Sequence, residues 1–232
     1  MEKKEYFENI ADDVQFVNFD RPRQLLEQRR AEIAVELLDV KAVPLAVLDV
    51  GCGEGLQLSR VHRVNPLASL VGLDLSEKRL SLARQRVPSM TPVCADLEMP
   101  LPLEPGRFDR ILCSEVLEHL IAPAELLTRL RGLLKPGGIL VITVPYRQLI
   151  RYVRCVHCGQ LTNEHRHSFS EEGIAVLLAE AGFELKRVLI PRLYWLTRTA
   201  FLPYQVWRRV HRLLESTVLR GGKPAYMFCV AQ

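Results

Sequence analysis

A glycine-rich turn after a short apolar run offers the clearest chemistry in the sequence. Residues 48–55 read Leu-Asp-Val-Gly-Cys-Gly-Glu-Gly, and glycines let the chain turn tightly while a ligand presses against the main chain. A dinucleotide-binding turn carries Gly-x-Gly-x-x-Gly/Ala and places a pyrophosphate at a helix N-terminus. Here Leu56 stands in the place of the third small residue, and Asp49 and Glu54 would repel a pyrophosphate. The turn therefore favours a ligand that carries an ammonium group.

Two further acids follow later apolar runs. Asp74 ends the second run, 25 residues after Asp49, and a carboxylate there can accept hydrogen bonds from both hydroxyls of a ribose. Asp96 follows the third run and can accept from an adenine amino group, while Leu97 offers a backbone N–H and an apolar edge. These acids suit any adenosine cofactor, so by themselves they do not separate a nicotinamide cofactor from another.

The elements that must position these residues alternate along the chain. Apolar runs predict strands and the intervening amphipathic segments predict helices. Strands are expected at 45–50, 69–75, 92–95, 108–114, 139–144, 183–190 and 226–230, and helices at 21–39, 55–63, 122–134 and 170–181, with another from Ser76. We interpret Lys135–Gly138 as a helix stop and turn. Repeated strand–helix units predict an α/β fold with a parallel sheet covered on both faces and a binding edge at the carboxyl ends of the strands.

Five motifs in order then identify a family. LDVGCGEG at 48–55, GLDLS at 72–76, CADLE at 94–98, FDRILCSEVLEHL at 108–120 and LLKPGGILVITVP at 133–145 resemble those of class I S-adenosylmethionine-dependent methyltransferases of the small single-domain type. The resemblance implies S-adenosylmethionine as cofactor and a Rossmann-like, mostly parallel seven-stranded sheet with an antiparallel last strand. An NAD-type oxidoreductase is the alternative, but it accounts for the first two motifs only. A catalytically silent cofactor-binding partner module is a third hypothesis.

The resemblance also implies which residues bind the cofactor. Asp49, Gly51 and Gly53 would line its methionine moiety, and Asp74 would hold the ribose. Leu75, Asp96 and Leu97 would surround the adenine, and Ser114 and Glu115 would lie close to the sulfonium. The complete expected set is Asp49, Gly51, Cys52, Gly53, Asp74, Leu75, Asp96, Leu97, Ser114 and Glu115.

The methyl acceptor is not identified by the sequence. A small-molecule or lipid-linked biosynthetic intermediate is our first hypothesis. A general base is needed only if the attacking atom must lose a proton, and His119 is the first candidate because an unperturbed imidazole titrates near pH ~6.5. The alternative is a structural histidine that caps the next helix. Tyr146 is a second candidate base.

A Cys/His cluster follows the fifth predicted strand. Cys155, Cys158, His165 and His167 have the residue types of a tetrahedral Cys2His2 zinc site, which would be structural because its shell is closed. A metal-free lid is the equal alternative, and a redox-active cysteine pair is a third.

Charge is unevenly distributed. The chain has 31 Lys+Arg against 27 Asp+Glu, a net +4, but segment 186–223 alone carries nine basic residues and one acid. Pro203 is expected to start a helix with Val206, Val210, Leu213 and Leu214 on one face, Trp207 at its edge, and Arg208, Arg209, Arg212 and Glu215 pointing away. We interpret it as a cap helix with a solvated basic face. The alternatives are peripheral membrane contact and binding of an anionic ligand; no recognised nucleic-acid module is present.

Composition sets the outer bounds. With 48% hydrophobic and 25% charged residues, the chain is not disordered, collagen-like or a disulfide-dense mini-protein. No run reaches the ~18 apolar residues of a membrane span, so we expect a cytoplasmic protein with reduced thiols, with peripheral membrane contact as an option. We expect an N-terminal helical cap over 1–40 and a methyltransferase domain over 41–232, with a Cys/His insertion at 150–169 and a basic helical insertion at 191–224.

Overall fold

The computed structural model describes residues 21–147, 153–154, 161–162, 165–191, 203, 205–210 and 226–232. Both cysteines of the predicted zinc site (Cys155 and Cys158), the first half of the expected N-terminal cap, and most of the basic stretch 191–224 lie outside the described residues. The helices are α2 (Arg21–Leu37), α3 (Leu56–Val64), α4 (Glu77–Arg86), the 3-10 turn η2 (Leu117–His119), α5 (Pro123–Leu133) and α6 (Glu171–Glu180). The strands are β1 (Ala46–Val50), β2 (Ser69–Asp74), β3 (Thr91–Cys94), β4 (Phe108–Ser114), β5 (Leu134–Pro145), β6 (Val153–Arg154), β7 (Leu161–Thr162), β8 (Leu185–Leu189) and β9 (Tyr226–Ala231).

Seven strands form one twisted sheet in the order β3-β2-β1-β4-β5-β9-β8. Strands β1 to β5 pair in parallel, and β9 runs antiparallel between β5 and β8. The predicted fold class and the antiparallel last strand are therefore confirmed. Strand order reverses between β1 and β4, and in doubly wound sheets ligands bind outside the carboxyl ends of the strands at such a reversal.

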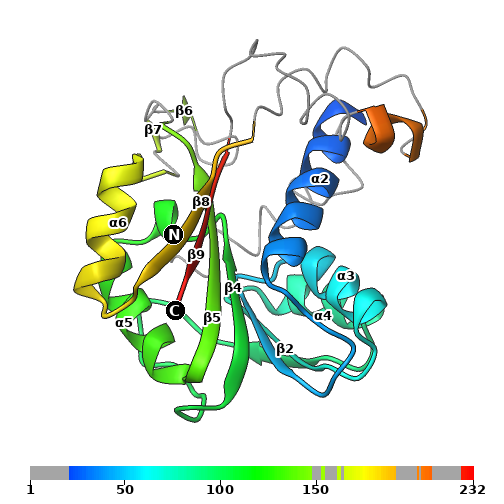
Figure 1. Ribbon diagram of the computed structural model, residues 1–232, viewed down its shortest axis with the longest axis horizontal. Coiled ribbons are helices and arrows are strands. Elements are labelled where there is room, and N and C mark those ends of the chain that lie inside the picture. The colour runs from blue at the N-terminus through cyan, green and yellow to red at the C-terminus, as the bar shows by residue number, and fades with distance from the viewer. Residues whose placement is uncertain are drawn as a thin grey trace.

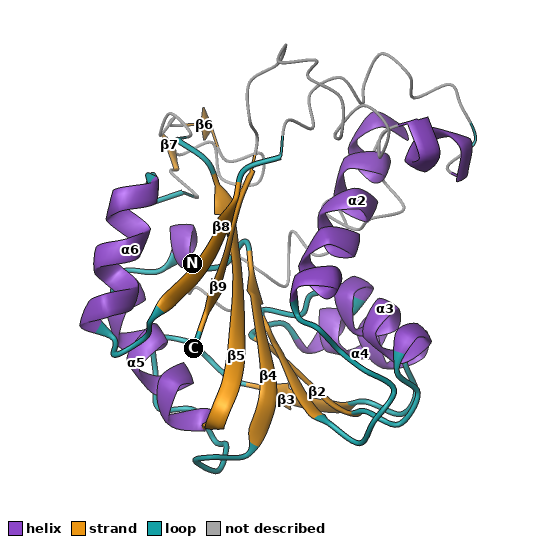
Figure 2. Ribbon diagram, in the orientation of Figure 1, coloured by secondary structure: helices purple, strands orange, loops and turns teal. Residues whose placement is uncertain are grey.

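Helices cover both faces of the sheet (Figures 1 and 2). On one face, α5 and α6 pack with Leu48 and Val50 of β1 in one apolar cluster. On the other face, α2, α3 and α4 pack with Val47 of the same strand in a second cluster. Successive residues of a strand point to opposite faces, which explains why the apolar run of β1 is continuous rather than alternating. Because helices cover both faces, we expect a ligand to bind at the ends of the strands.

Serines begin two of the helices as predicted. The hydroxyl of Ser76 accepts a hydrogen bond from the backbone N–H of Arg79 at the start of α4, and that of Ser170 accepts from Gly173 at the start of α6. Each satisfies one of the N–H groups that a helix leaves unpaired at its first turn. Among the described residues, no helix has the length and apolar composition needed to cross a bilayer.

The prediction of a helix stop and turn at Lys135–Gly138 was wrong in part. Helix α5 does end at Leu133, but β5 begins at once, and its pairing with β4 jumps from Phe108–Leu134 to Arg110–Ile139. The extra residues bulge out of the strand, which lets pairing resume in register. A Cβ on Gly138 would lie 2.8 Å from Leu134 Cδ2 and 3.2 Å from the Phe108 carbonyl oxygen, so glycine is needed where the bulge crowds β4.

The helix in the basic segment starts where predicted but faces differently. The Trp207 N–H donates to the Pro203 carbonyl oxygen over 2.9 Å, and residues 205–210 are helical. Trp207, expected at the edge of the apolar face, is 0% exposed, whereas Val206, expected on that face, is 47% exposed. The larger aromatic side chain gains more from burial, so it sets the orientation.

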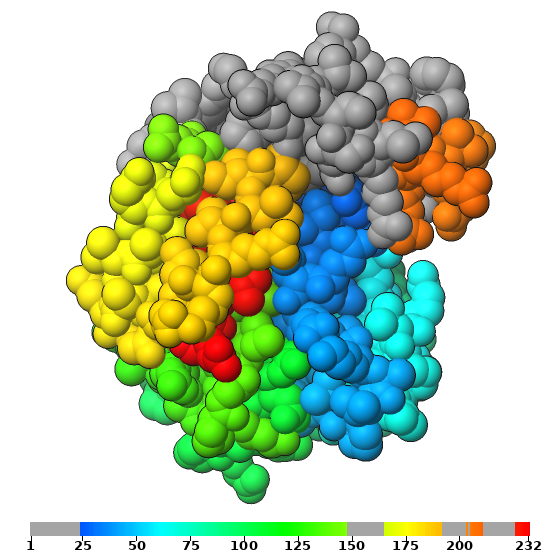
Figure 3. All heavy atoms as spheres, viewed as in Figure 1, coloured from blue at the N-terminus to red at the C-terminus, as the bar shows by residue number. Residues whose placement is uncertain are grey.

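Trp207 joins the apolar cluster of α2, α3 and α4. Its neighbour Arg208, predicted to point away, instead lies 3.4 Å from Glu32 of α2. Figure 1 shows this short helix in orange at the upper end of α2, and the space-filling view in Figure 3 shows it on the same side of the molecule as α2 and α3. The described part of the basic segment is therefore docked on the N-terminal helix.

Candidate cofactor and acceptor site

Three glycines shape the turn between β1 and α3. Gly51, Gly53 and Gly55 have φ values of 68°, 52° and 73°, a left-handed backbone that other residues adopt only with strain. A Cβ on Gly51 would lie 2.5 Å from Val116 Cγ2 in the loop after β4. The turn therefore packs directly against the end of β4, where a side chain at position 51 would not fit.

Two acids lie beneath this turn. Asp74, at the end of β2, accepts the Gly53 N–H at 2.9 Å and the Ser76 N–H at 3.0 Å, so its two oxygens hold the turn and the next helix together. Asp49 is buried, and its Oδ2 accepts no hydrogen bond within the described part of the chain. Burial, with a smaller contribution from Asp74, raises the pKa of Asp49 well above its usual range. The pair forms an acidic floor that suits a cationic ligand.

Other expected cofactor residues lie along the same edge. Asp96 Oδ1 accepts the Glu98 N–H at 3.0 Å in the loop after β3, and Leu97 is half-buried against the core. Leu75 follows Asp74 at the end of β2. Cys52 differs from the rest because its side chain is buried in the core cluster, with its Sγ 2.9 Å from where a Gly72 Cβ would be. Its side chain therefore does not line a ligand site, and Cys52 can border one through its backbone alone.

The end of β4 carries Ser114 and Glu115. The Ser114 hydroxyl lies 2.7 Å from Thr143 Oγ1 and accepts from Gln57 Nε2 of α3 at 3.3 Å. Glu115 has a positive φ of 54° and accepts from Thr143 Oγ1 at 3.2 Å. Burial raises the pKa of Glu115 to about 7, although the neighbouring Arg30 guanidinium acts in the opposite direction.

Arg30 of α2 is a site residue that the sequence did not single out. Its Nη1 lies 3.0 Å from Glu115 Oε2, its Nη2 pairs with Glu27, and its guanidinium stacks 5.0 Å from the centre of the Tyr226 ring on β9. The nearby carboxylates, Glu27 foremost, outweigh burial and raise the pKa of Arg30. Arg30 sits among several other arginines on α2, so the sequence alone gives no signal for it.

The candidate bases lie near the same edge. His119 ends η2, with its Nε2 3.9 Å from Glu118 Oε1. The Tyr146 hydroxyl donates to Glu171 Oε1 of α6 at 3.1 Å, and this hydrogen bond adds to the effect of desolvation in raising the pKa of Tyr146. His119 is thus the candidate that adjoins the buried acids, while Tyr146 is tied to α6.

The two histidines of the predicted zinc site point to different partners. The His165 ring packs edge-on against the His119 ring with centroids 4.8 Å apart. His167 Nε2 lies 2.9 Å from the Leu120 carbonyl oxygen. With both cysteines outside the described residues, the structure shows His165 beside His119 and His167 beside the backbone.

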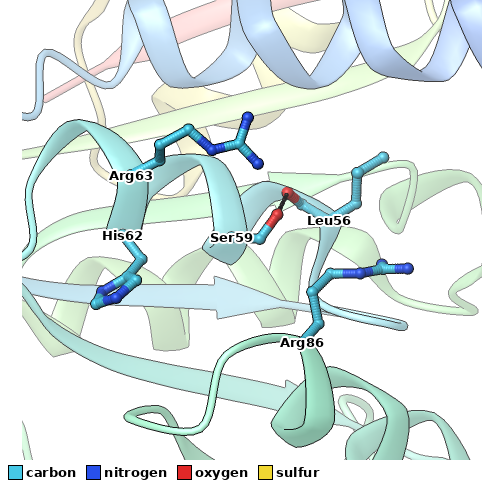
Figure 4. Close-up of a pocket in the computed structure, with 5 residues that line it drawn as sticks. All are labelled: Leu56, Ser59, His62, Arg63 and Arg86. Carbon is cyan, nitrogen blue, oxygen red and sulfur yellow. Dashed lines mark hydrogen bonds between the residues drawn. The ribbon is translucent and has the colours of Figure 1, made fainter.

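A surface pocket lies on α3, next to the C-terminal end of the glycine turn. It has a volume of about 410 Å³ and is lined by Leu56, Ser59, His62, Arg63 and Arg86. Figure 4 shows these side chains on α3 and at the end of α4, with the Ser59 hydroxyl turned onto the Leu56 carbonyl. Arg86 is paired with Glu54 at 3.2 Å. None of the expected cofactor-binding residues lines this pocket.

Comparison with known proteins identifies the family. A methyltransferase domain matches residues 18–188. A ubiquinone biosynthesis O-methyltransferase from Thiobacillus denitrificans is 31% identical over 166 residues, covering 65% of this chain and 70% of that protein. A trans-aconitate 2-methyltransferase from Methylobacterium radiotolerans is 30% identical over 199 residues, covering 83% and 73%.

Two further matches concern part of a relative and the fold, respectively. The chain spans 33% of an uncharacterized transposon protein from Streptomyces fradiae, at 34% identity over 116 residues. This chain also aligns with the crystal structure of an S-adenosylmethionine-dependent methyltransferase from Mesorhizobium loti. The alignment covers 87% of this chain and 97% of that chain, with a TM-score of 0.63 and 23% identity. The glycine turn over buried acids, the sheet order and the domain match agree, and the chain belongs to the class I S-adenosylmethionine-dependent methyltransferases.

Proposed function

We propose that this enzyme methylates an oxygen atom of a small-molecule or lipid-linked biosynthetic intermediate. The support for oxygen as the acceptor atom is that the Thiobacillus relative is an O-methyltransferase of ubiquinone biosynthesis. The trans-aconitate enzyme among the relatives acts on a different kind of small molecule. These two relatives support a small-molecule acceptor, and the individual acceptor is to be found by experiment.

The single observation that carries the cofactor assignment is the acidic floor under the glycine turn. A buried carboxylate with an unpaired oxygen is costly unless a cation or a donor meets it, and Asp49 presents such an oxygen in the described structure. A bound S-adenosylmethionine offers an ammonium group and a sulfonium, and its methyl group is already activated for transfer. The residues present therefore fit this cofactor better than a pyrophosphate.

The chain's own residues would orient the cofactor from the ends of four strands, β1 to β4. Gly51 and Gly53 would admit its methionine moiety against the backbone, and Asp49 would face the ammonium group. Asp74 keeps one lone pair on each oxygen after bonding Gly53 and Ser76, so it can still accept from ribose hydroxyls. Asp96 and Leu97 would border the adenine, and Ser114 and Glu115 the reacting end. Alignment of this kind can supply ~7–11 kcal/mol to a transfer reaction.

Calorimetry with the full chain tests the cofactor assignment. We expect S-adenosylmethionine and S-adenosylhomocysteine to bind, and NAD not to bind under the same conditions. Asp74→Asn should weaken the binding of both S-adenosylmethionine and S-adenosylhomocysteine. Asp109→Asn is the matched control, because Asp109 also accepts a backbone N–H, from Ala46 at 2.8 Å, but at the start of the strands. Tight binding of NAD alone would overturn the assignment.

A labelled-methyl assay tests the acceptor class. The enzyme would be incubated with S-adenosylmethionine carrying a labelled methyl group and with three acceptor sets: phenols and catechols, carboxylic acids, and amines. Label in ethers or esters supports an oxygen acceptor, and the two are separated by the lability of esters to alkali. Label confined to amines would contradict the proposal. A lipid-linked acceptor would be favoured if transfer rises when prenylated phenols are presented in anionic vesicles.

A further inference from the structure

Three side chains outside the predicted cofactor set converge after β4. The carboxylate of Glu118 and the imidazoles of His119 and His165 each place one potential ligand atom within 4.8 Å of the others. Glu118 and His119 belong to η2, whereas His165 comes from the segment before α6. Their approach depends on the fold rather than on sequence spacing.

Backbone hydrogen bonds fix this approach. The Glu118 carbonyl oxygen accepts the N–H of Arg166 at 2.6 Å and that of His167 at 3.3 Å. His167 Nε2 in turn lies 2.9 Å from the Leu120 carbonyl oxygen. The two residues that follow His165 are therefore anchored to Glu118 and Leu120, which places the His165 imidazole beside that of His119.

The burial of the Glu118 carboxylate needs an explanation. Its residue is 1% exposed, and neither carboxylate oxygen accepts a hydrogen bond from the part of the chain that the structure describes. Arg30, the nearby cation, makes its close contacts with Glu115 and Glu27 instead. A buried carboxylate in this state costs several kcal/mol unless a positive charge compensates it. A cation held between Glu118 and the two histidines would supply that charge.

We propose that Glu118, His119 and His165 bind a divalent transition-metal ion. Two imidazole nitrogens and one carboxylate oxygen suit zinc, manganese or iron(II) better than the hard ions magnesium and calcium, which favour oxygen ligands. Metal–ligand bonds of about 2.0–2.2 Å require the three atoms to draw together by roughly an ångström, which side-chain rotation can provide. Three protein ligands leave coordination positions open, as in catalytic rather than structural sites.

This site divides the histidines of the sequence-predicted Cys2His2 set. His165 becomes a ligand together with His119, while His167 serves the backbone of Leu120. It also changes the chemistry expected of His119, because an imidazole whose lone pair binds a metal is not available as a general base. His119 would then act on the acceptor through the ion.

The role of the ion rests on the proposed oxygen acceptor. A hydroxyl bound at an open position has a lowered pKa and releases its proton to water. Its oxygen lone pair then forms the bond to the methyl carbon as the carbon–sulfur bond breaks. The electron pair of that bond stays on sulfur, so the cationic cofactor leaves as a neutral thioether. The charges balance without any oxidation or reduction.

Metal binding is measured on the chelator-treated full chain without any acceptor. Zinc and manganese titrations would be followed by calorimetry, and cobalt(II) titrations by absorption. We expect Glu118→Gln and His165→Ala each to weaken metal affinity by at least about tenfold, as is typical when a group that supports a bound metal ion is replaced. His62→Ala is the matched control, because it also removes an imidazole but lies on α3, outside the Glu118, His119 and His165 group, and it should keep the affinity. Thermal unfolding of each variant checks that the fold is retained.

The cobalt absorption spectrum distinguishes this site from the Cys2His2 site that the sequence predicted. Cobalt bound by nitrogen and oxygen lacks a thiolate charge-transfer band, and the double variant Cys155→Ser/Cys158→Ser should bind the ion like the parent chain. A charge-transfer band that disappears in this double variant would overturn the proposal in favour of the cysteine site. Absence of binding by all three metals would also overturn it.

The two proposals fail separately. If S-adenosylhomocysteine binds and label reaches oxygen acceptors while no metal binds, the metal site alone is wrong. If metal binds through Glu118 and His165 but label reaches amines only, the site stands as a metal site and the oxygen acceptor is wrong.

Discussion

The carboxyl ends of β2 and β4 both carry buried acids, but the molecule compensates them in different ways. Asp74 after β2 is held by two backbone N–H groups, both within 21 residues of it. Glu115 after β4 is balanced by Arg30, a side chain from the N-terminal helix. Glu118 lies beside His119 and His165, from two segments of the chain, and on our proposal a bound cation compensates it. At the end of β2 the acid is held by backbone N–H groups near it in the sequence. At the end of β4 the acids depend on side chains from distant parts of the chain.

This difference bears on function. A site built on backbone donors keeps its shape when side chains elsewhere change, which suits a cofactor that the whole family shares. A site assembled from distant side chains can change with each of them, which suits an acceptor that differs among relatives. The predictions that follow test this division, from the largest expected effect to the smallest.

Replacing Arg30 should have the largest effect on stability. Arg30→Met removes the cation from a largely buried group that includes Glu27 and Glu115, whose side chains are 12–17% exposed, and breaking a fully buried ion pair by removing one partner costs up to about 3–5 kcal/mol. Urea unfolding monitored by circular dichroism gives the free energy of unfolding. The double variant Arg30→Met/Glu115→Gln should recover part of the loss. A single-variant loss under about 1 kcal/mol would show that α2 does not compensate the acids after β4.

Gly51→Ala should damage the glycine turn. Its φ of 68° is strained for alanine by about 1–3 kcal/mol, and its Cβ would meet Val116 Cγ2 at 2.5 Å. We expect a comparable loss of stability and at least about tenfold weaker binding of S-adenosylhomocysteine, which is about 1.4 kcal/mol. Gly106→Ala is the matched control, since Gly106 has a φ of 62° with nothing within 4 Å of its added Cβ. Equal affinity losses in both variants would argue against a cofactor role for the turn.

Asp74→Asn should weaken both the fold and cofactor binding. An amide keeps the acceptor for one of the two backbone N–H groups and presents a donor to the other, at a cost of about 1–3 kcal/mol for an unsatisfied buried group. We expect the affinity for S-adenosylhomocysteine to fall about tenfold, measured by calorimetry. An unchanged affinity together with lowered stability would make Asp74 purely structural.

Asp109→Asn should have the smallest effect and a pH-dependent one. Desolvation acts to raise the pKa of Asp109, but hydrogen bonds from Lys135 and from the Ala46 N–H outweigh it and lower the pKa below its usual value. A lowered pKa adds stability above the unfolded-state value of about 3.9, and this is lost as pH falls through the folded-state pKa. We expect the variant to lose about 1 kcal/mol near neutral pH.

The difference in stability between Asp109→Asn and the parent chain should then disappear in acid. Thermal unfolding at a series of pH values measures this difference. A difference that grows on acidification would contradict a lowered pKa for Asp109. Cofactor affinity should not change, because Asp109 lies at the start of the strands.

Local chemistry explains what the sequence could predict. The glycine turn, the serine caps and the strand before each acid depend on residues next to one another, and they lie where their patterns indicated. Arg30, Trp207 and the pairing of His119 with His165 could not be predicted, because each depends on contacts between elements far apart in the chain. The early start of β5 was missed for a related reason, since the bulge at Gly138 is set by crowding against β4 rather than by the turn-like sequence around it.

The place of β9 has a consequence for synthesis. Residues 226–231 occupy a position inside the sheet, between β5 and β8, although they follow every other strand in the chain. Until the ribosome has made them, β5 presents an open edge and β8 has no partner strand in the sheet. Open strand edges recruit other chains, so nascent chains of this enzyme should depend on chaperones until β9 closes the gap.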